Sequence, residues 1–337
     1  MDDRPPPPEA LARLCGSYAL TQAGPARRIS ERVWRLPTAT GDVAVKLYRT
    51  GQRDRAFKEA ALLAHLRAHP DARFRVQDLM VTASGDAVWI SEDDDASAML
   101  TRWETGRFRT YDTYASEEWA ALGASLAALH VGLDALRGLP VALDTLSARL
   151  RALDADALRR ELADAPARAP THAGSARLRQ YVDTCLRLID AHHPGSLSAF
   201  PGGDPQRPIH NDYNQFNYLF GGTLPPLVLD WEASIGAPRE YELVRCMNHL
   251  PLEAPELAQA FVHAYLHVRP LRAERMAWAV DAACLQHALK HWLLQGWLAD
   301  PPSFETSLQG ALRMVSMMDG ARGRLIDFYQ QCLHAQR

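Results

Sequence analysis

Two stretches of the chain, HNDYNQFN at residues 210–217 and LVLDWE at residues 227–232, are the most informative about its fold and chemistry. Short apolar segments separated by a Gly-Gly and a Pro-Pro pair predict a tight hairpin that joins the two stretches. Pairing of its strands is expected to place Asn217 opposite Asp230. Asp212 lies in the loop just before the hairpin, so two carboxylates and a carboxamide are predicted to converge at one end of a rigid element.

This donor set favours a particular chemistry. Carboxylate and amide oxygens suit magnesium, a hard cation that usually keeps some water and takes substrate phosphates as further ligands. A carboxylate beside such a metal can orient a hydroxyl group and accept its proton. We therefore interpret Asn217 and Asp230 as metal ligands and Asp212 as the group that meets the hydroxyl. The alternative is an acidic loop beside a buried hairpin.

A second region of interest is VAVK at residues 43–46. Alternation along a strand places Ala44 and Lys46 on one face and the flanking valines on the other. The next segment, residues 53–68, is rich in helix formers and ends before a proline. On a helical wheel Glu59 lies within the apolar face of this helix, where an unpaired carboxylate is costly. Lys46 is the expected partner; the alternative is a solvated Glu59 at the rim and a surface lysine.

The order of predicted elements indicates an α+β fold in two lobes. Residues 1–102 read as a small antiparallel sheet with one helix, and residues 1–10 as a flexible tail. Residues 103–337 read as mostly helical, with the hairpin as their only clear strand pair. The predicted strands of the first part are residues 32–36, 43–48, 87–91 and 98–103.

Composition excludes several classes of protein. The chain has 337 residues, 47% of them hydrophobic, and a net charge of −3 from 37 basic and 40 acidic residues, so it gives no general attraction to nucleic acid or to an anionic membrane. No apolar run is long enough to cross a bilayer, and the acidic, Pro-rich start does not resemble a secretory signal. Five widely spaced cysteines indicate free thiols in a reducing compartment, and we expect a cytoplasmic protein.

The loop HNDYNQFN resembles the H-x-D-x-x-x-x-N catalytic loop of the kinase-like small-molecule phosphotransferases, the superfamily of aminoglycoside phosphotransferases, choline kinase and protein-kinase-like homoserine kinase. LDWE is similar to their metal-binding segment, and VAVK to the V-A-I-K strand of kinases. The resemblance implies a bilobal protein-kinase-like fold.

The resemblance also implies roles for individual residues. Asp212 would be the catalytic residue, and Asn217 and Asp230 would hold Mg²⁺. Lys46, set by Glu59, would contact the ATP phosphates. Ala44 would line the adenine pocket, and the backbone near Thr101 and Arg102, in the linker between the lobes, would meet the adenine edge.

The sequence departs from kinases of the protein type in the nucleotide loop. Residues 28–34 contain no glycine where those kinases carry G-x-G-x-x-G. Ser30 is a candidate to cap a phosphate and Arg32 to add positive charge, and a plain exposed turn is the alternative. No A-P-E-like element follows LDWE, which disfavours a protein kinase.

The predicted activity is transfer of a phosphoryl group from ATP, or GTP, to a hydroxyl of a small molecule. An amino alcohol such as homoserine, a sugar or an aminoglycoside-like acceptor are all open, and residues 231–249 are expected to supply acidic and basic groups for the acceptor. The rival interpretation is a non-catalytic kinase-like nucleotide-binding protein. A monomer and a homodimer are both compatible with the sequence.

Overall fold

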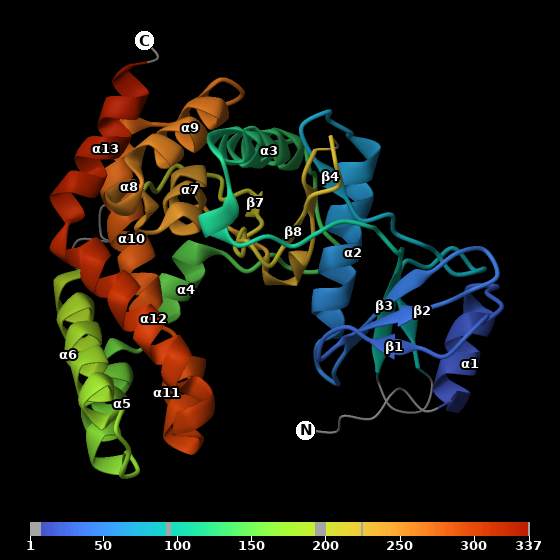
Figure 1. The fold of residues 1–337 in the computed structure, drawn as a ribbon, viewed down its shortest axis with the longest axis horizontal. Helices are drawn as coiled ribbons and strands as arrows, with labels where there is room; N and C mark the ends of the chain where they lie inside the picture. The colour runs from blue at the N-terminus through green and yellow to red at the C-terminus, as the bar shows by residue number, and fades with distance from the viewer. Residues whose placement is uncertain (1–7, 92–95, 193–199, 224, 336–337) are drawn as a thin grey trace. The chain divides into compact units, whose positions relative to one another are not determined.

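A computed structural model describes residues 8–91, 96–192, 200–223 and 225–335 of the chain. Its elements form the predicted α+β fold, with an antiparallel sheet near the N-terminus and mostly helices toward the C-terminus (Figure 1). The chain divides into two compact units, each made of several segments. Unit 1 comprises Met1–Tyr114, Ser125–Leu143 and Pro208–Ile235, and unit 2 comprises Ala115–Ala124, Asp144–Arg207 and Gly236–Arg337. The sequence-based division at residues 102 and 103 stays a prediction.

Unit 1 contains a five-stranded antiparallel sheet. Its strands, in spatial order, are β1 (Arg27–Arg28), β2 (Val33–Leu36), β3 (Val43–Tyr48), β6 (Ser97–Arg102) and β5 (Trp89–Ile90). The prediction for β3 is confirmed residue for residue, and the other predicted strands are shorter or begin one residue away. The central strand β3 pairs with β2 and β6 along its length, so its side chains have fixed faces.

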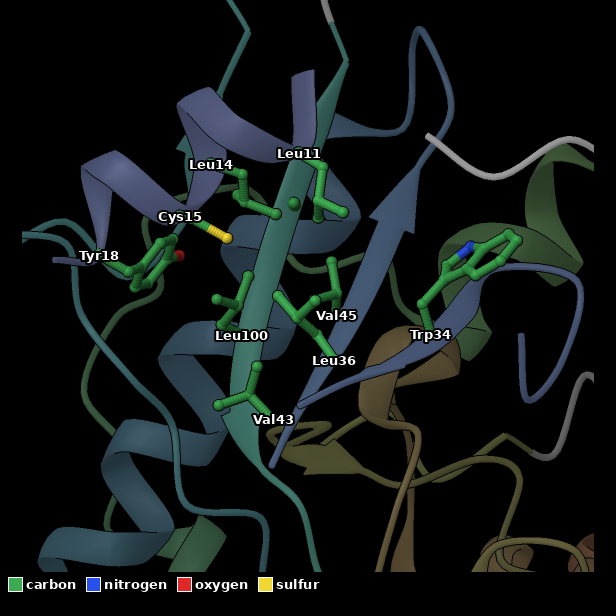
Figure 2. Packing of buried hydrophobic residues seen from close by; sticks show 10 residues of the cluster. Leu11, Leu14, Cys15, Tyr18, Trp34, Leu36, Val43, Val45 and Leu100 are labelled. Carbon is green, nitrogen blue, oxygen red and sulfur yellow. The ribbon is translucent and has the colours of Figure 1, made fainter. Parts of the chain in front are cut away.

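One face of this sheet packs against helix α1 (Pro8–Ser17). Leu11, Leu14 and Tyr18 form an apolar stripe that buries itself on Val43 and Val45 of the central strand (Figure 2). The predicted tail is therefore wrong for residues 8–10, since the helix begins at Pro8; residues 1–7 lie outside the described part of the chain. Proline is tolerated in the first turn of a helix, so the Pro-rich run did not exclude one here.

The other face of the sheet packs against helix α2 (Arg53–Ala68), whose limits match the prediction. Its buried face contains five apolar residues and one carboxylate: Ala56, Ala60, Leu62, Leu63, Leu66 and Glu59. Because β3 alternates, Val43 and Val45 face α1 while Lys46 reaches the α2 side. The predicted burial of Glu59 within an apolar face is confirmed.

A three-stranded sheet contains the predicted hairpin. It has the order β4 (Arg75–Val76), β9 (Leu227–Val228) and β8 (Tyr218–Leu219), and β4 runs parallel to β9. The predicted hairpin is present, but its register differs by one residue. The Leu229 amide donates to the Asn217 carbonyl at 2.9 Å, so Asn217 lies opposite Leu229 and not opposite Asp230.

Five further elements lie wholly or partly in unit 1. They are η1 (Tyr111–Thr113), α3 (Ser116–Asp134), β7 (Pro208–Ile209), η3 (Trp231–Ala233) and β10 (Ile235–Gly236). Helix α3 starts in unit 2 and ends in unit 1. The second half of α3 buries His130, and Gly132 there accepts a hydrogen bond from His65 of α2 at 2.9 Å.

Unit 2 is helical. Its helices are α4 (Leu146–Ala152), α5 (Ala155–Arg168), α6 (Ser175–His192), α7 (Arg239–Met247), α8 (Leu250–Glu253), α9 (Pro255–Leu266), η4 (Ala273–Arg275), α10 (Met276–Ala288), α11 (His291–Ala299), α12 (Pro301–Gly320) and α13 (Arg322–His334). Helix α10 is buried almost all round and packs against α6, α7, α12 and α13, so it forms the centre of this unit. All five cysteines are free, as predicted. Among the described helices, none is both long and apolar enough to cross a membrane.

The burial of Leu14, which is 2% exposed, predicts how strongly α1 holds the sheet. Leu14→Ala removes a buried side chain and leaves a cavity, so we expect the free energy of unfolding to fall by about 2–5 kcal/mol in urea denaturation. Arg13→Ala on the exposed face of the same helix is the control, with an expected change within about 0.5 kcal/mol. Equal small changes for both variants would contradict the packing of α1.

Candidate active site

Lys46 is the centre of a charged cluster in unit 1. Its Nζ atom lies 2.7 Å from Glu59 Oε2, 2.6 Å from Asp230 Oδ1 and 3.3 Å from Glu232 Oε2. The predicted pairing of Lys46 with Glu59 is therefore present, and two more carboxylates share the same ammonium group. The site joins β3, α2 and the turn after β9.

Glu59 is fully buried, and its carboxylate accepts three hydrogen bonds. The donors are Lys46 Nζ, the Tyr48 hydroxyl at 2.6 Å and the Trp231 backbone amide at 3.1 Å. A buried carboxylate is costly unless it is both paired and hydrogen-bonded, and here both conditions hold. The Trp231 amide is the contact with the largest consequence, because it fixes the residue that follows Asp230.

The electrostatics of the cluster keep Lys46 charged. Burial lowers the pKa of Lys46, but attraction by Glu59, Asp230 and Glu232 outweighs burial, and the pKa is raised above its usual value. The pKa of Tyr48 is raised well above 10 by burial and by the neighbouring Glu59 carboxylate. Tyr48 therefore remains a hydroxyl donor to Glu59.

Asp230 is held by its backbone. It has a φ of 61° and a ψ of 71°, the left-handed region that a residue other than glycine adopts only when its surroundings require it. The hydrogen bond from the Trp231 backbone amide to Glu59, together with the start of η3 at Trp231, holds Asp230 in this conformation. The Asp230 side chain is 42% exposed, so one of its oxygens reaches Lys46 while the group remains accessible to a ligand.

The loop at residues 210–217 holds Asp212 through two side-chain amides. Asn214 Nδ2 donates to Asp212 Oδ1 and Asn217 Nδ2 to Asp212 Oδ2, both at 2.9 Å. Asn217 Nδ2 also lies 2.8 Å from the Asp212 carbonyl, so its oxygen is the amide atom directed elsewhere. The arrangement orients the Asp212 carboxylate and leaves the Asn217 oxygen as a candidate cation ligand.

His210 is a scaffold residue of this loop. Its side chain is buried, Nε2 lies 2.8 Å from the Leu229 carbonyl, and Nδ1 accepts the Asp212 amide at 3.2 Å. Because the ring faces an acceptor at Nε2 and a donor at Nδ1, these contacts assign a neutral ring protonated at Nε2. His210 therefore ties the loop to the hairpin.

Tyr111 and Gln215 form a reciprocal clamp on the same loop. The Tyr111 amide donates to Gln215 Oε1 at 2.6 Å, and the Gln215 amide donates to the Tyr111 hydroxyl at 3.1 Å. The two residues are 104 positions apart, so no local sequence pattern indicates the contact. The clamp, together with two backbone hydrogen bonds between Arg107 and Phe220, fixes residues 107–111 against the loop that carries Asp212.

The residues predicted to meet the nucleotide base lie together on β3 and β6. Ala44 is paired with Thr101 across the sheet, and Arg102 follows Thr101. The Arg102 amide donates to the Asp78 carbonyl at 2.9 Å, so that donor is used within the protein. Thr101 is buried and Arg102 is exposed, and their contribution to nucleotide binding stays a prediction. Ser30, the other predicted residue, is exposed in the turn before β2.

Arg32, a predicted candidate for added positive charge, joins the cluster through Glu232, which was not a predicted site residue. Arg32 donates to both oxygens of Glu232, at 2.8 and 2.5 Å, across a separation of 200 residues. Burial raises the pKa of Glu232, but Arg32 and Lys46 outweigh it and lower the pKa to about 2. The sequence signals were one of the two arginines of a glycine-free turn and the Glu that ends LDWE.

The donor chemistry fits a divalent cation at Asp230 and Asn217. Among the described residues, Glu59, Asp230 and Glu232 bring ligand atoms within 4.8 Å of one another. The Lys46 ammonium contacts all three of these carboxylates, and Glu59 is committed to three donors. Asp230 is accessible and held at the hairpin end, and its role as a metal ligand together with the Asn217 amide oxygen stays a prediction.

The expected acceptor contribution of residues 231–249 stays a prediction. Arg239, Glu240 and Glu242 on α7 are 4%, 3% and 1% exposed, and Glu240 accepts the Arg272 amide at 3.0 Å. These three side chains lie inside unit 2, whereas Arg245 of the same helix is partly exposed.

The chain was compared with known proteins. The family model described as the phosphotransferase enzyme family matches residues 22–278. A search of curated proteins found no match.

Several solved structures share the fold. An amicoumacin kinase in complex with AMP-PNP, Ca²⁺ and its ligand is 14% identical, with 93% of each chain covered and a TM-score of 0.67. An aminoglycoside phosphotransferase from Alicyclobacillus acidocaldarius is 16% identical over 99% of this chain and 98% of that one, with a TM-score of 0.63. A microcompartment-associated aminopropanol kinase is 17% identical over 96% and 98%, with a TM-score of 0.59. The match over residues 22–278 places the chain in the phosphotransferase enzyme family.

Proposed function

We propose that the protein transfers the γ-phosphoryl group of ATP, or of GTP, to a hydroxyl group of a small molecule, with Mg²⁺ bound at Asp230 and Asn217. The observation that carries the proposal is the Lys46 cluster, in which β3, α2 and the turn after β9 meet on one ammonium group. Asp212 and its two orienting amides lie in the same compact unit.

Each residue has a role that follows from its contacts. Lys46, fixed by Glu59, neutralises phosphate charge, and Asp230 and Asn217 hold the metal. When bound, Mg²⁺ would supply further charge neutralisation on the phosphates. Asp212 orients the acceptor hydroxyl and receives its proton as the new O–P bond forms and the bond from the γ-phosphorus to the bridging oxygen breaks. The transition state is loose, so positioning and charge neutralisation supply most of the rate.

The acceptor is proposed as a small hydroxylated molecule, with amino alcohols tested first. Solved structures that share the fold include an amicoumacin kinase, a spectinomycin phosphotransferase and an aminopropanol kinase, and aminopropanol is an amino alcohol. Sugars and aminoglycosides complete the acceptor panel. Aminoglycosides are tested last, because they carry several positive charges and the carboxylates of α7 are buried.

The proposal is tested by measuring phosphorylation of this panel with ATP and with GTP, each in the presence of Mg²⁺ or of EDTA. We expect phosphorylated product from at least one acceptor, and only with the metal. Binding of nucleotide without turnover of any acceptor would favour the rival interpretation, a non-catalytic nucleotide-binding protein.

Asp212→Asn is expected to lower kcat by about 10²–10⁴-fold, because the acceptor hydroxyl loses its proton acceptor and its orientation. The affinity for nucleotide should change little, since Asp212 is placed at the acceptor side of the reaction. Steady-state kinetics and calorimetric nucleotide binding measure the two quantities, and Asp112→Asn on the exposed η1 is the control. Loss of binding in proportion to turnover would contradict the role assigned to Asp212.

Lys46→Met is expected to lower the free energy of unfolding by about 3–5 kcal/mol, because it leaves the fully buried Glu59 without its cation. Lys58→Met, on the same helix as Glu59, loses one hydrogen bond to the Ser234 carbonyl and should cost about 1 kcal/mol.

Adding Glu59→Gln to Lys46→Met should restore more than half of the lost stability, since the double variant buries no unpaired charge at this point. Urea denaturation measures all four proteins. Additive losses in the double variant would show that the two side chains are not coupled.

A further inference from the structure

The turn before β2 uses two of its backbone amides to close itself. Ile29 and Ser30 both direct their backbone amides at the Val33 carbonyl, at 2.9 and 3.2 Å, and Arg28 Nε donates to the Ser30 carbonyl at 3.1 Å. In a glycine-rich loop the backbone amides approach the phosphates. Here those of Ile29 and Ser30 close the turn instead and are not available to a phosphate, so a cationic side chain can supply the missing contact.

Arg32 is the side chain placed to supply it. Its carbonyl accepts the Leu47 amide at 2.9 Å, and the next residue, Val33, pairs with Lys46 across the sheet. The Arg32 guanidinium lies on Glu232, whose Oε2 is 3.3 Å from Lys46 Nζ. Arg32 and Lys46 thus flank a single carboxylate, and the Arg32 side chain is 24% exposed.

The charges of the cluster explain why a phosphate could replace Glu232 as the partner of Arg32. The cluster contains two cations, Arg32 and Lys46, and three carboxylates, those of Glu59, Asp230 and Glu232, which gives a net charge of −1. A polyphosphate meeting that charge would be repelled. A guanidinium binds phosphate and carboxylate oxygens with the same two-pronged geometry, so a phosphate can replace Glu232 as the partner of Arg32.

We infer that Arg32 is a phosphate-binding residue that takes the place of the missing glycine-rich amides, and that Glu232 holds it in position until a nucleotide displaces the carboxylate. This inference rests on the proposed function and deepens it, since it assigns a second cation beside Lys46 to the phosphate chain of the nucleotide.

The test measures affinity for adenosine, AMP, ADP and ATP by calorimetry, without divalent cations and in the presence of EDTA. Arg32→Gln should weaken ATP binding by about 10- to 100-fold, the effect of losing hydrogen bonds to a charged group, and leave adenosine binding within twofold. Arg32→Lys should fall between the two, because it keeps the charge and loses the two-pronged contact. Glu232→Gln should tighten ATP binding, since it removes both the competing partner and one negative charge.

Arg49→Gln is the matched control. Arg49 pairs with Glu31 of the same turn on the exposed surface and does not contact the Lys46 cluster among the interactions described. This variant should bind ATP as the unchanged protein does, and thermal unfolding of each variant checks that the fold is kept.

The outcomes separate the two ideas. Unchanged ATP affinity in Arg32→Gln, or equal loss of adenosine and ATP binding, would overturn the role of Arg32 and leave the proposed function standing. Failure of the unchanged protein to bind any nucleotide, with Mg²⁺ as well as in EDTA, would overturn the proposed function, and this inference with it.

Discussion

The buried carboxylate of Glu59 is the constraint on which the site depends. With its side chain fully buried, Glu59 needs its donors, and it takes three of them from two parts of the chain: Lys46 and Tyr48 on β3, and the backbone amide of Trp231 after β9. Each donor is therefore held at a defined distance from α2. The pairing sets the position of the lysine and, through Trp231, the backbone conformation of Asp230.

The rest of the site is positioned mainly by backbone and amide groups. His210 joins the loop to the hairpin through two backbone contacts, and the side-chain amides of Asn214 and Asn217 orient the Asp212 carboxylate. Such groups carry no net charge, so they fix the geometry without adding a formal charge to the site. The charged residues are gathered instead in the Lys46 cluster.

The sequence predicted those parts of the structure that local patterns determine. The helix over residues 53–68 and its pairing with Lys46 followed from one carboxylate inside an apolar stripe. Helix α1 was missed because its first residues belong to a Pro-rich run. The hairpin was predicted, but its register was wrong by one residue, because apolar pattern alone does not fix which amide pairs with which carbonyl. The Arg32–Glu232 and Tyr111–Gln215 contacts join residues far apart in sequence, and their geometry appears only once the chain is folded.

The reciprocal clamp between Tyr111 and Gln215 has an evolutionary consequence. Each residue satisfies the main-chain N–H of the other, so replacing either side chain orphans a donor on its neighbour. Positions 111 and 215 are therefore expected to change together among relatives. A chimaera that joins residues 107–111 of one homologue to the loop at residues 210–217 of another should take both residues from the same parent.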